Sequence, residues 1–319
     1  MRHPGWQYRK GLHDLGGGNW AWLQPDGSWG FSNAGLVADS EQTLLVDTLF
    51  DLPLTRTMLE AMRDAVPAAA RVDTLVNTHA NGDHCFGNEL VEGAVIVSSR
   101  ACAEEMGEVP PSLLAEMVRN ADSFGPAGAF MRDAFGAFEF EGITLTRPTE
   151  TFEGEQTRRV GDKEVRLFEV GPAHTRGDVI VHVPADGVVY TGDILFIEGH
   201  PIIWEGPIGN WIRACERICE MEPEVVVPGH GPLTDVSGVR AVRDYLATLE
   251  REARARFDAG MPVEEAARDI ALDDYASWGD AERIVVNLNT LYREFDPSRP
   301  AAATTELFTL MAELRRERR

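Results

Sequence analysis

The chain has 319 residues, of which 44% are hydrophobic, so it can bury a substantial core in one large domain or in two. Its 52 acidic residues outnumber its 30 basic residues, and the formal net charge of −22 disfavours nucleic acid or an anionic membrane as a partner. The sequence contains neither a signal-peptide run near its start nor an apolar stretch of about 18 residues. We therefore expect a cytoplasmic protein whose four cysteines are reduced.

Strand-forming and helix-forming patterns alternate through the first hundred residues. Apolar runs bounded by polar or Pro-Asp-Gly turns predict strands. These strands span residues 21–23, 32–38, 43–47, 72–77 and 94–98. Apolar side chains at helical spacing predict a helix over 54–66, which Pro67 ends, and a shorter helix over 85–91. This alternation is typical of an α/β protein.

Residues 100–140 interrupt the alternation. Pro110 and Pro111 begin a helical stretch that runs to Arg119, glycines follow at 125 and 128, and phenylalanines crowd the end of the segment. Such a segment is typical of a helical insertion that covers an active site as a lid. A surface subdomain with its own packing fits the pattern equally well.

The second half of the chain resembles the first in plan. Strands are predicted over residues 149–152, 165–170, 179–183, 188–190 and 225–227, and helices over 211–221 and 236–259. Two β-rich halves with helices between them predict two sheets packed face to face, with helices on the outer faces. We expect a catalytic domain over 1–235 and a C-terminal helical extension over 236–319, in which nearly all of 262–319 is helical.

Four of the predicted strands run into loops that carry metal-ligand residues. The residues are His79, Asn81, Asp83 and His84 after the strand at 72–77, then His174, Asp193 and His230 after three later strands. Loops beyond the carboxyl ends of neighbouring strands meet in space, so we expect these side chains to converge. Imidazole and carboxylate are ligands of zinc, and manganese or iron also fits such nitrogen and oxygen donors.

The four motifs resemble the ordered metal motifs of the metallo-β-lactamase-fold superfamily. They are His79-x-Asn81-x-Asp83-His84, Gly171-Pro172-Ala173-His174, Thr191-Gly192-Asp193 and Pro228-Gly229-His230-Gly231. The resemblance covers about residues 20–235 and implies an αββα sandwich and a metallohydrolase. It also implies two metal sites, formed by His79, residue 81 and His174 and by Asp83, His84 and His230, with Asp193 between them.

Asn81 stands where this superfamily normally has a histidine, and it therefore decides how many metal ions we expect. An amide oxygen is neutral and a weaker zinc ligand than imidazole, so the site that includes His79 and His174 is depleted. The other site keeps two carboxylates and two imidazoles. We expect one tightly bound zinc ion and a weak or absent second ion. The alternative is that Asn81 still ligates through its oxygen in an ordinary dinuclear site.

The expected reaction is hydrolysis of a small substrate by a metal-bound hydroxide. A divalent ion lowers the pKa of its water from near 16 toward about 7. Asp83 is expected to act both as a ligand and as a proton acceptor. If His79 and His174 are free of metal, they are expected to orient the water or to stabilise oxyanion charge.

The loop after the third motif is expected to form the wall of the substrate pocket. It contains Phe196, His200 and Trp204, and Trp211 follows closely. These side chains indicate an aromatic or hydrophobic ester, thioester or lactone as the substrate. Tryptophans at this spacing occur equally often in a protein core, so the sequence leaves both the pocket wall and the core open as their location.

Further segments resemble the metallo-β-lactamase-fold cyclases and thioesterases of aromatic polyketide biosynthesis. They include Ser32-Asn33-Ala34-Gly35, Val46-Asp47-Thr48, Phe86-Gly87-Asn88 and residues 222–227. This resemblance implies an alternative function, a cyclase that uses the metal for intramolecular aldol condensation. Hydrolytic dehalogenation of an activated aromatic ring and a non-catalytic binding protein are two further alternatives. A small molecule is the expected partner, and the sequence leaves a homodimer open.

Overall fold

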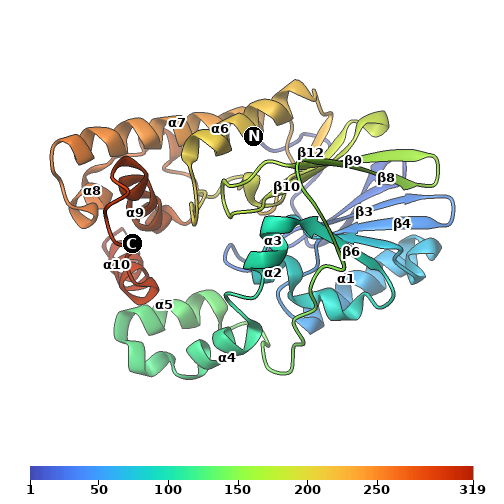
Figure 1. Cartoon of the computed structure of the whole chain (residues 1–319), viewed down its shortest axis with the longest axis horizontal. Helices are drawn as coiled ribbons and strands as arrows, with labels where there is room; N and C mark the ends of the chain where they lie inside the picture. The colour runs from blue at the N-terminus through green and yellow to red at the C-terminus, as the bar shows by residue number, and fades with distance from the viewer. Residues whose placement is uncertain (319) are drawn as a thin grey trace.

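Residues 1–318, the part of the chain that the computed structural model describes, form two β-sheets packed face to face (Figure 1). The seven-stranded sheet follows chain order: β1 (Gly11–Gly16), β2 (Asn19–Leu23), β3 (Ala34–Asp39), β4 (Gln42–Val46), β5 (Thr74–Val76), β6 (Val95–Ser99) and β7 (Glu150–Phe152). The five-stranded sheet has the order β12 (Val225–Val227), β11 (Val188–Tyr190), β10 (Val179–Val183), β9 (Lys163–Glu169) and β8 (Glu155–Val160). Helices cover both outer faces, which confirms the predicted αββα sandwich.

Strands β10, β11 and β12 of the five-stranded sheet are buried on both faces, and this explains why their residues are mostly apolar. On β10, Val179 and Val181 face the other sheet, whereas Ile180 packs under the helices. Successive side chains of a strand point to opposite faces, so a strand covered on both sides needs apolar residues at every position. The valine run of β12 follows the same rule.

Helices α1 (Leu52–Ala65), α6 (Ile208–Glu220) and α7 (Val236–Asp258) form the two outer layers. Met58 on the apolar side of α1 packs on the seven-stranded sheet, and Trp211 of α6 packs on the five-stranded sheet. Burying one such side chain contributes about 1.5–3 kcal/mol. The outer layers thus hold the strands, and the loops that follow them, in fixed positions.

Two parallel strand pairs bring the ligand-bearing loops together. β4 and β5 run parallel with Val46 beside Val76, and β11 and β12 run parallel with Tyr190 beside Val227. Parallel neighbours end at the same edge of a sheet, so the loops that follow them meet there. The two sheets pack face to face, and these edges together form the floor of the candidate site.

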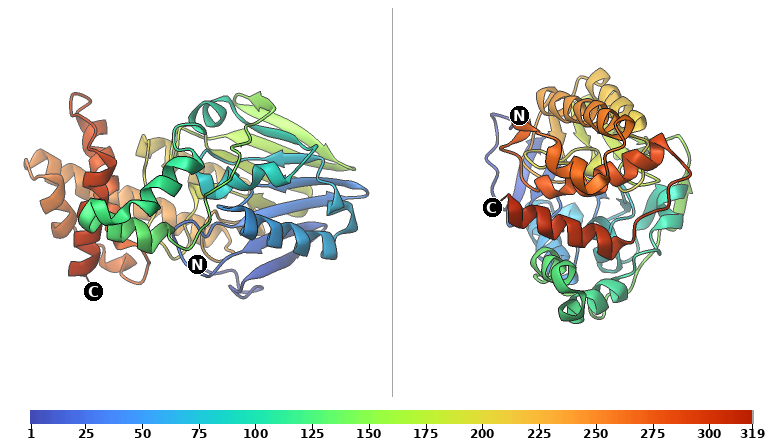
Figure 2. Two further views of the ribbon diagram at one scale, coloured as in Figure 1. Left: turned by 90° about the horizontal axis from the view of Figure 1, so that it is seen from below. Right: turned by 90° about the vertical axis from the view of Figure 1, so that its left-hand side faces the viewer.

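Seven further helices lie within residues 1–318. They are α2 (Gly82–Cys85), α3 (Arg100–Glu105), α4 (Pro111–Arg119), α5 (Gly125–Phe135), α8 (Val263–Asp269), α9 (Ile284–Phe295) and α10 (Thr304–Glu317). α10 lies beside α5, although the two are far apart in the sequence (Figures 1 and 2). Phe130 of α5 stacks on Phe308 of α10 with ring centroids 5.6 Å apart. Within residues 1–318, no helix is long and apolar enough to cross a membrane.

Several elements differ from the sequence prediction. The sequence predicts a helical insertion over 100–140 but does not single out α5 within it, because glycine disfavours helix. Gly128 is needed where α5 crosses the preceding segment, since a Cβ there would collide with the carbonyl oxygen of Ala121. The edge strands β1 and β8 also go unpredicted, because most of their side chains are not buried. Residues 270–283, expected to be helical, form only the short 3-10 helices Asp273–Tyr275 and Ala281–Arg283. Between these two helices the chain pairs with the loop at His200, whose N–H donates to the carbonyl of Gly279 at 2.9 Å.

Glu294 on α9 makes the stability of this fold depend on pH. Its carboxylate accepts the N–H of Ile208, at the start of α6, at 2.9 Å. Burial raises the pKa of Glu294 to about 7, and the charge of Glu250 acts in the same sense. The unfolded glutamate has a pKa of about 4.3, so the folded state holds the proton more tightly. Protonation of Glu294 therefore stabilises the folded state relative to the unfolded state below about pH 4, and this stabilisation is lost as the pH rises toward 7.

We predict that Glu294→Gln melts at a higher temperature than the wild type at pH 8, because glutamine keeps the acceptor oxygen without the buried charge. The difference between the two melting temperatures should shrink at pH 5. Thermal denaturation of both proteins at the two pH values measures this. Equal differences at pH 5 and pH 8 would contradict the assignment.

Candidate metal centre

The carboxylate of Asp193 lies among four imidazoles at the floor of the site. Its Oδ2 is 3.3 Å from Nε2 of His174, 3.4 Å from Nε2 of His230 and 3.7 Å from Nε2 of His79. Its Oδ1 is 3.2 Å from Nε2 of His84. The structure therefore brings together residues that are more than a hundred positions apart in the sequence.

Asp83 supplies a second carboxylate to the same cluster. Its Oδ2 is 3.3 Å from Nε2 of His230 and 3.8 Å from Nε2 of His84. Two groups of side chains have spacings that suit a metal ion: His79 with His84 and Asp193, and Asp83 with His84 and His230. His84 belongs to both groups.

Local backbone explains how these residues reach one another. Asp83 and His84 lie on α2, the single helical turn that follows β5, while Asp193 and His230 follow β11 and β12. Gly229 is needed beside them, because a Cβ there would collide with Oδ1 of Asp193. The buried amide of Asn33 donates to the carbonyls at 228 and 231, at 3.0 and 2.9 Å, and so holds the His230 loop in place.

Each of the four histidines has a protein acceptor at Nδ1. The acceptors are the hydroxyl of Thr78 for His79 at 3.0 Å, Oδ2 of Asp47 for His84 at 2.9 Å, the carbonyl of Ile202 for His174 at 2.7 Å and the carbonyl of Phe31 for His230 at 3.2 Å. The Thr78 hydroxyl itself donates to Asp47, so it accepts from His79. Nδ1 therefore carries the hydrogen in each ring, and Nε2 faces the centre with a lone pair whenever the ring is neutral.

Asp47 has a positioning role that the sequence prediction does not assign. Its carboxylate accepts Nδ1–H of His84 and both the N–H and the hydroxyl of Thr78, the last two at 2.7 Å. Burial raises the pKa of Asp47, while the neighbouring His84 lowers it. The signal was present in the sequence, because Asp47 directly follows a buried strand that runs parallel to the His79 strand.

The charge of the two aspartates falls mainly on one side of the centre. Burial lowers the pKa of His79 well below its ordinary value of 6.5. Burial acts in the same sense on His84 and His230, but Asp193 and Asp83 outweigh it. The pKa of His84 therefore lies well above its ordinary value, and that of His230 rises to about 9. Positive charge is stabilised most strongly beside His84 and His230.

Three buried atoms of the centre have no hydrogen-bond partner within residues 1–318. They are Nε2 of His79, together with Nε2 of His84 and Oδ1 of Asp193, which lie 3.2 Å apart but do not form a hydrogen bond with each other. A buried polar atom without a partner costs about 1–3 kcal/mol. Imidazole nitrogens and a carboxylate oxygen that face one another are the donor set of a divalent transition-metal ion. The residues present therefore fit such a cation.

The side chain of Asn81 contacts a histidine of the centre. Asn81 is the N-cap residue of α2, but its side chain does not cap that helix. Its Oδ1 lies 2.8 Å from Nε2 of His174. Because Nδ1 of His174 donates to a carbonyl, Nε2 of the neutral ring is an acceptor, so a hydrogen bond between the two side chains requires the amide turned by 180°, with its NH₂ group toward Nε2. In either orientation the amide lies against the nitrogen through which His174 would bind an ion.

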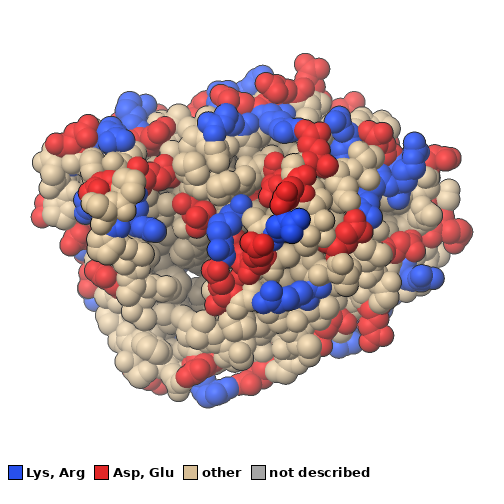
Figure 3. Space-filling model, in the orientation of Figure 1, with Lys and Arg blue, Asp and Glu red and all other residues tan. Residues whose placement is uncertain are grey.

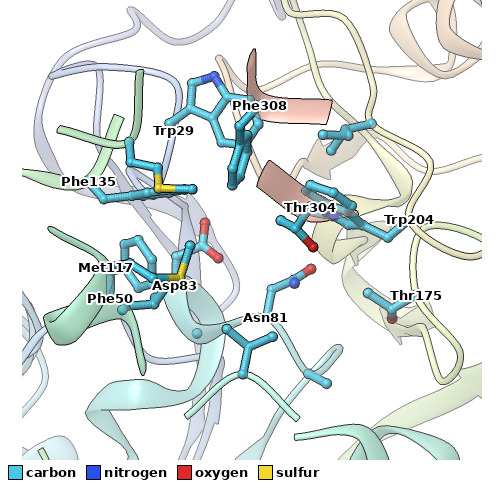
Figure 4. A pocket seen from close by; sticks show the side chains of 18 of the residues that line it. Trp29, Phe50, Asn81, Asp83, Met117, Phe135, Thr175, Trp204, Thr304 and Phe308 are labelled. Atoms are coloured by element: carbon cyan, nitrogen blue, oxygen red, sulfur yellow. The ribbon is translucent and has the colours of Figure 1, made fainter. Parts of the chain in front are cut away.

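A cavity of about 530 Å³ opens above the centre. The surface is hollowed between the part formed by α5 and α10 and the part formed by α2 and α3 (Figure 3). Trp29, Phe135 and Phe308 lie on one side of the cavity and Trp204 lies on another, while Asp83 and Asn81 point into the space between (Figure 4). Most of its lining is therefore apolar and aromatic. Segment 100–140 supplies Leu113, Leu114 and Met117 to the wall.

The four predicted pocket residues divide into two pairs. Phe196 and Trp204 line the cavity, and the Phe196 ring stacks on His230 with centroids 5.1 Å apart. His200 does not line it, because its ring is buried against Tyr245 and Trp278.

Trp211 also lies outside the cavity lining, because α6 packs it on the five-stranded sheet. Its Nε1 donates to the carbonyl of Ile194 at 2.9 Å, and its ring meets that of His174 edge-on at 5.7 Å. Trp211 therefore supports a residue of the centre from behind rather than contacting a substrate.

Comparison with known proteins gives the family. The family model of the metallo-beta-lactamase superfamily matches residues 27–230. The hydroxyacylglutathione hydrolase of Maricaulis maris (strain MCS10) is 24% identical over 248 residues, which cover 77% of this chain and 70% of that protein.

Two solved structures share the fold. The stereoselective inverting sec-alkylsulfatase Pisa1 from Pseudomonas sp. superposes with a TM-score of 0.66 at 15% identity and covers 91% of this chain, which spans 51% of the sulfatase. The metallo-beta-lactamase from Pontibacter korlensis superposes with a TM-score of 0.55 at 20% identity, covering 75% of this chain and 99% of that one. The chain therefore belongs to the metallo-beta-lactamase superfamily and is a metallohydrolase of that fold.

Proposed function

We propose that this chain hydrolyses small aromatic or hydrophobic esters, thioesters or lactones, and that its centre holds one divalent metal ion tightly, with zinc as the first choice. The proposal rests mainly on the position of the metal centre, which lies at the floor of the cavity. Asp83, Asp193 and His230 line the floor of a space whose walls are mainly aromatic. A substrate can bury an apolar body there while its carbonyl carbon faces the centre.

The tight ion is assigned to Asp83, His84, Asp193 and His230. These residues offer two carboxylates and two imidazoles. The two carboxylates formally neutralise the charge of a divalent ion, and the four ligands leave room for a water molecule. On the other side of the centre, the Asn81 amide engages Nε2 of His174 and adds no negative charge. The second position therefore lacks both a third imidazole and a free His174.

A divalent ion in this site supplies a Lewis acid and lowers the pKa of water from near 16 toward about 7. Asp83 lines the cavity beside His230 and is placed to accept the proton of the attacking water. Nε2 of His79 is buried beside Asp193, and this ring is placed to orient water. The aromatic walls exclude bulk water and so strengthen each of these polar contacts.

One substrate panel tests this function against its alternatives. The panel contains aryl esters, aryl thioesters, lactones and halogenated aromatics, each assayed with and without a chelator. Chelator-sensitive release of acid and alcohol or thiol supports the proposed hydrolase. Chelator-sensitive release of halide only would favour dehalogenation, and turnover of none would favour a cyclase or a binding protein. The similarity to a protein named as a hydroxyacylglutathione hydrolase supports hydrolysis.

We predict that the purified wild-type protein retains about one equivalent of metal, and that Asn81→His raises this toward two, because the substitution adds an imidazole and removes the amide that engages His174. Metal quantification after dialysis measures the ratio. Asn81→Ala is the matched control, since it removes the amide without adding a ligand and should stay near one. Two tightly held ions in the wild type would contradict the single-ion assignment.

We predict that Asp83→Ala lowers kcat/KM by roughly 10²–10⁴-fold, because a ligand and a proton acceptor are lost together. Steady-state kinetics on the best ester of the panel measures the change. Thr305→Ala is the control, because Thr305 lines the cavity on an exposed helix end and its hydroxyl belongs to none of the contacts of the centre. Wild-type activity in Asp83→Ala would rule out the scheme.

We predict that Asp47→Asn weakens metal affinity by roughly 10–100-fold, because the acceptor that fixes the ring of His84 loses its charge. Competition with a chromogenic chelator measures the affinity. Asp73→Asn is the control, since Asp73 bonds the backbone of Thr43 at 3.0 Å, at the far end of the same pair of strands. An equal loss of affinity in both variants would mean that Asp47 acts on the fold alone.

A further inference from the structure

Arg283 is a buried cation in the wall of the cavity. It ends the short 3-10 helix Ala281–Arg283, directly before α9, and its side chain is 3% exposed. Among the described residues that line the cavity, it is the one lysine or arginine. A charged side chain is rarely buried without partners, because leaving water costs several kcal/mol. Its partners therefore indicate what the site is built to hold.

The protein satisfies the guanidinium of Arg283 incompletely. One terminal nitrogen donates to the carbonyl of His200 at 2.9 Å, and the other lies 3.4 Å from Oδ2 of Asp280. Charge-assisted hydrogen bonds are normally about 2.7–2.9 Å long, so the contact with Asp280 is a loose one. Within residues 1–318, Nε of Arg283 has no acceptor.

The nearest carboxylate is shared with other groups. Oδ1 of Asp280 accepts the hydroxyl of Ser28 at 2.8 Å and lies 3.8 Å from the guanidinium of Arg315. Arg315 also pairs with Glu282. Oδ2 of Asp280, which faces Arg283, makes no hydrogen bond within residues 1–318. With Oδ1 engaged elsewhere, Asp280 does not form with Arg283 the two parallel hydrogen bonds that a dedicated carboxylate gives.

Two aromatic rings hold the guanidinium of Arg283 in place. Its central carbon is 4.6 Å from the ring centre of Trp29 and 5.1 Å from that of Phe196, and both rings line the cavity. Cation–π contacts of this kind fix the orientation of an arginine and leave its in-plane donors free for an anion.

Phe196 also relates Arg283 to the metal centre. Its ring also stacks on His230 at 5.1 Å with an interplanar angle of 6°, and it meets the ring of His174 edge-on at 5.6 Å. Arg283 is thus separated from a candidate metal ligand by no more than one aromatic ring. A single small molecule can contact both, because Arg283 and His230 line the same cavity of about 530 Å³.

We infer that Arg283 forms an anion subsite and that the substrate is an amphiphilic carboxylate, with an apolar body between its carboxylate and its scissile bond. The carboxylate binds at Arg283, the body packs along Trp29 and Phe196, and the scissile carbonyl reaches the centre. A carboxylate matches the planar fork of arginine. The scissile bond rests on the proposed function, whereas the anion subsite does not.

Equilibrium binding of two matched probes tests the subsite. The probes are 4-phenylbutyrate and its uncharged counterpart 4-phenylbutanamide, titrated calorimetrically into the wild-type protein. The wild type is expected to prefer the carboxylate by about tenfold or more. In Arg283→Gln the preference should fall to near one, through weaker binding of the carboxylate and unchanged binding of the amide.

Arg315→Gln is the matched control. Arg315 shares Asp280 with Arg283 but does not line the cavity, so this variant should keep the preference. Loss of the preference in both variants, or its retention in Arg283→Gln, overturns the subsite. If Arg283→Gln does not fold, Arg283→Lys replaces it: the fork is lost, the preference should fall several-fold, and a full preference overturns the proposal.

Each titration is repeated on chelator-treated protein. A preference that survives metal removal supports the subsite, and one that disappears belongs to the metal centre and overturns it. Binding needs no turnover, so the two proposals fail separately. If no ester of the panel is hydrolysed but the preference holds, the proposed function fails alone; if esters are hydrolysed without a preference, the subsite fails alone.

Discussion

The metal centre depends on the acceptors at Nδ1 of its four histidines. Imidazole is a ligand only through a nitrogen that carries no hydrogen, so the ring must be fixed in one tautomer before an ion arrives. Asp47 does this for His84, and backbone carbonyls do it for His174 and His230. Asp47 directly follows β4, and Phe31 and Ile202 lie in loops that border the centre. The sandwich thus specifies the chemistry of the centre as well as its position.

Those parts of the fold and the site that repeat a simple physical rule could be predicted from the sequence. Buried strands such as β12 are continuous apolar runs, and the residue types that follow them identify the ligands. The edge strand β8 could not be predicted, because its side chains are mostly unburied. His200 and Trp211 could not be placed either, because the sequence does not reveal whether an aromatic side chain faces a cavity or a core.

Asp47 and Arg283 went unassigned for a related reason. Neither belongs to a ligand motif, and each acts through a partner that only the tertiary structure supplies: His84 for Asp47, and the rings of Trp29 and Phe196 for Arg283. Asn81 is the opposite case. Its place in the motif identifies the anomaly at once, and the structure adds the contact with His174 that gives the anomaly a chemical meaning.

The stacking of Phe130 on Phe308 joins α5 to α10 above a centre to which neither helix contributes a ligand. The part of the cavity wall formed by α5 and α10, which we call the roof, and the metal ligands are thus encoded by separate stretches of the gene. Mutations in the roof can alter the accepted substrate while the hydrolytic machinery stays intact, and the reverse also holds. Evolution can therefore change the substrate specificity of this chain with little loss of catalytic activity. The same separation suits a fold whose members act on many different compounds.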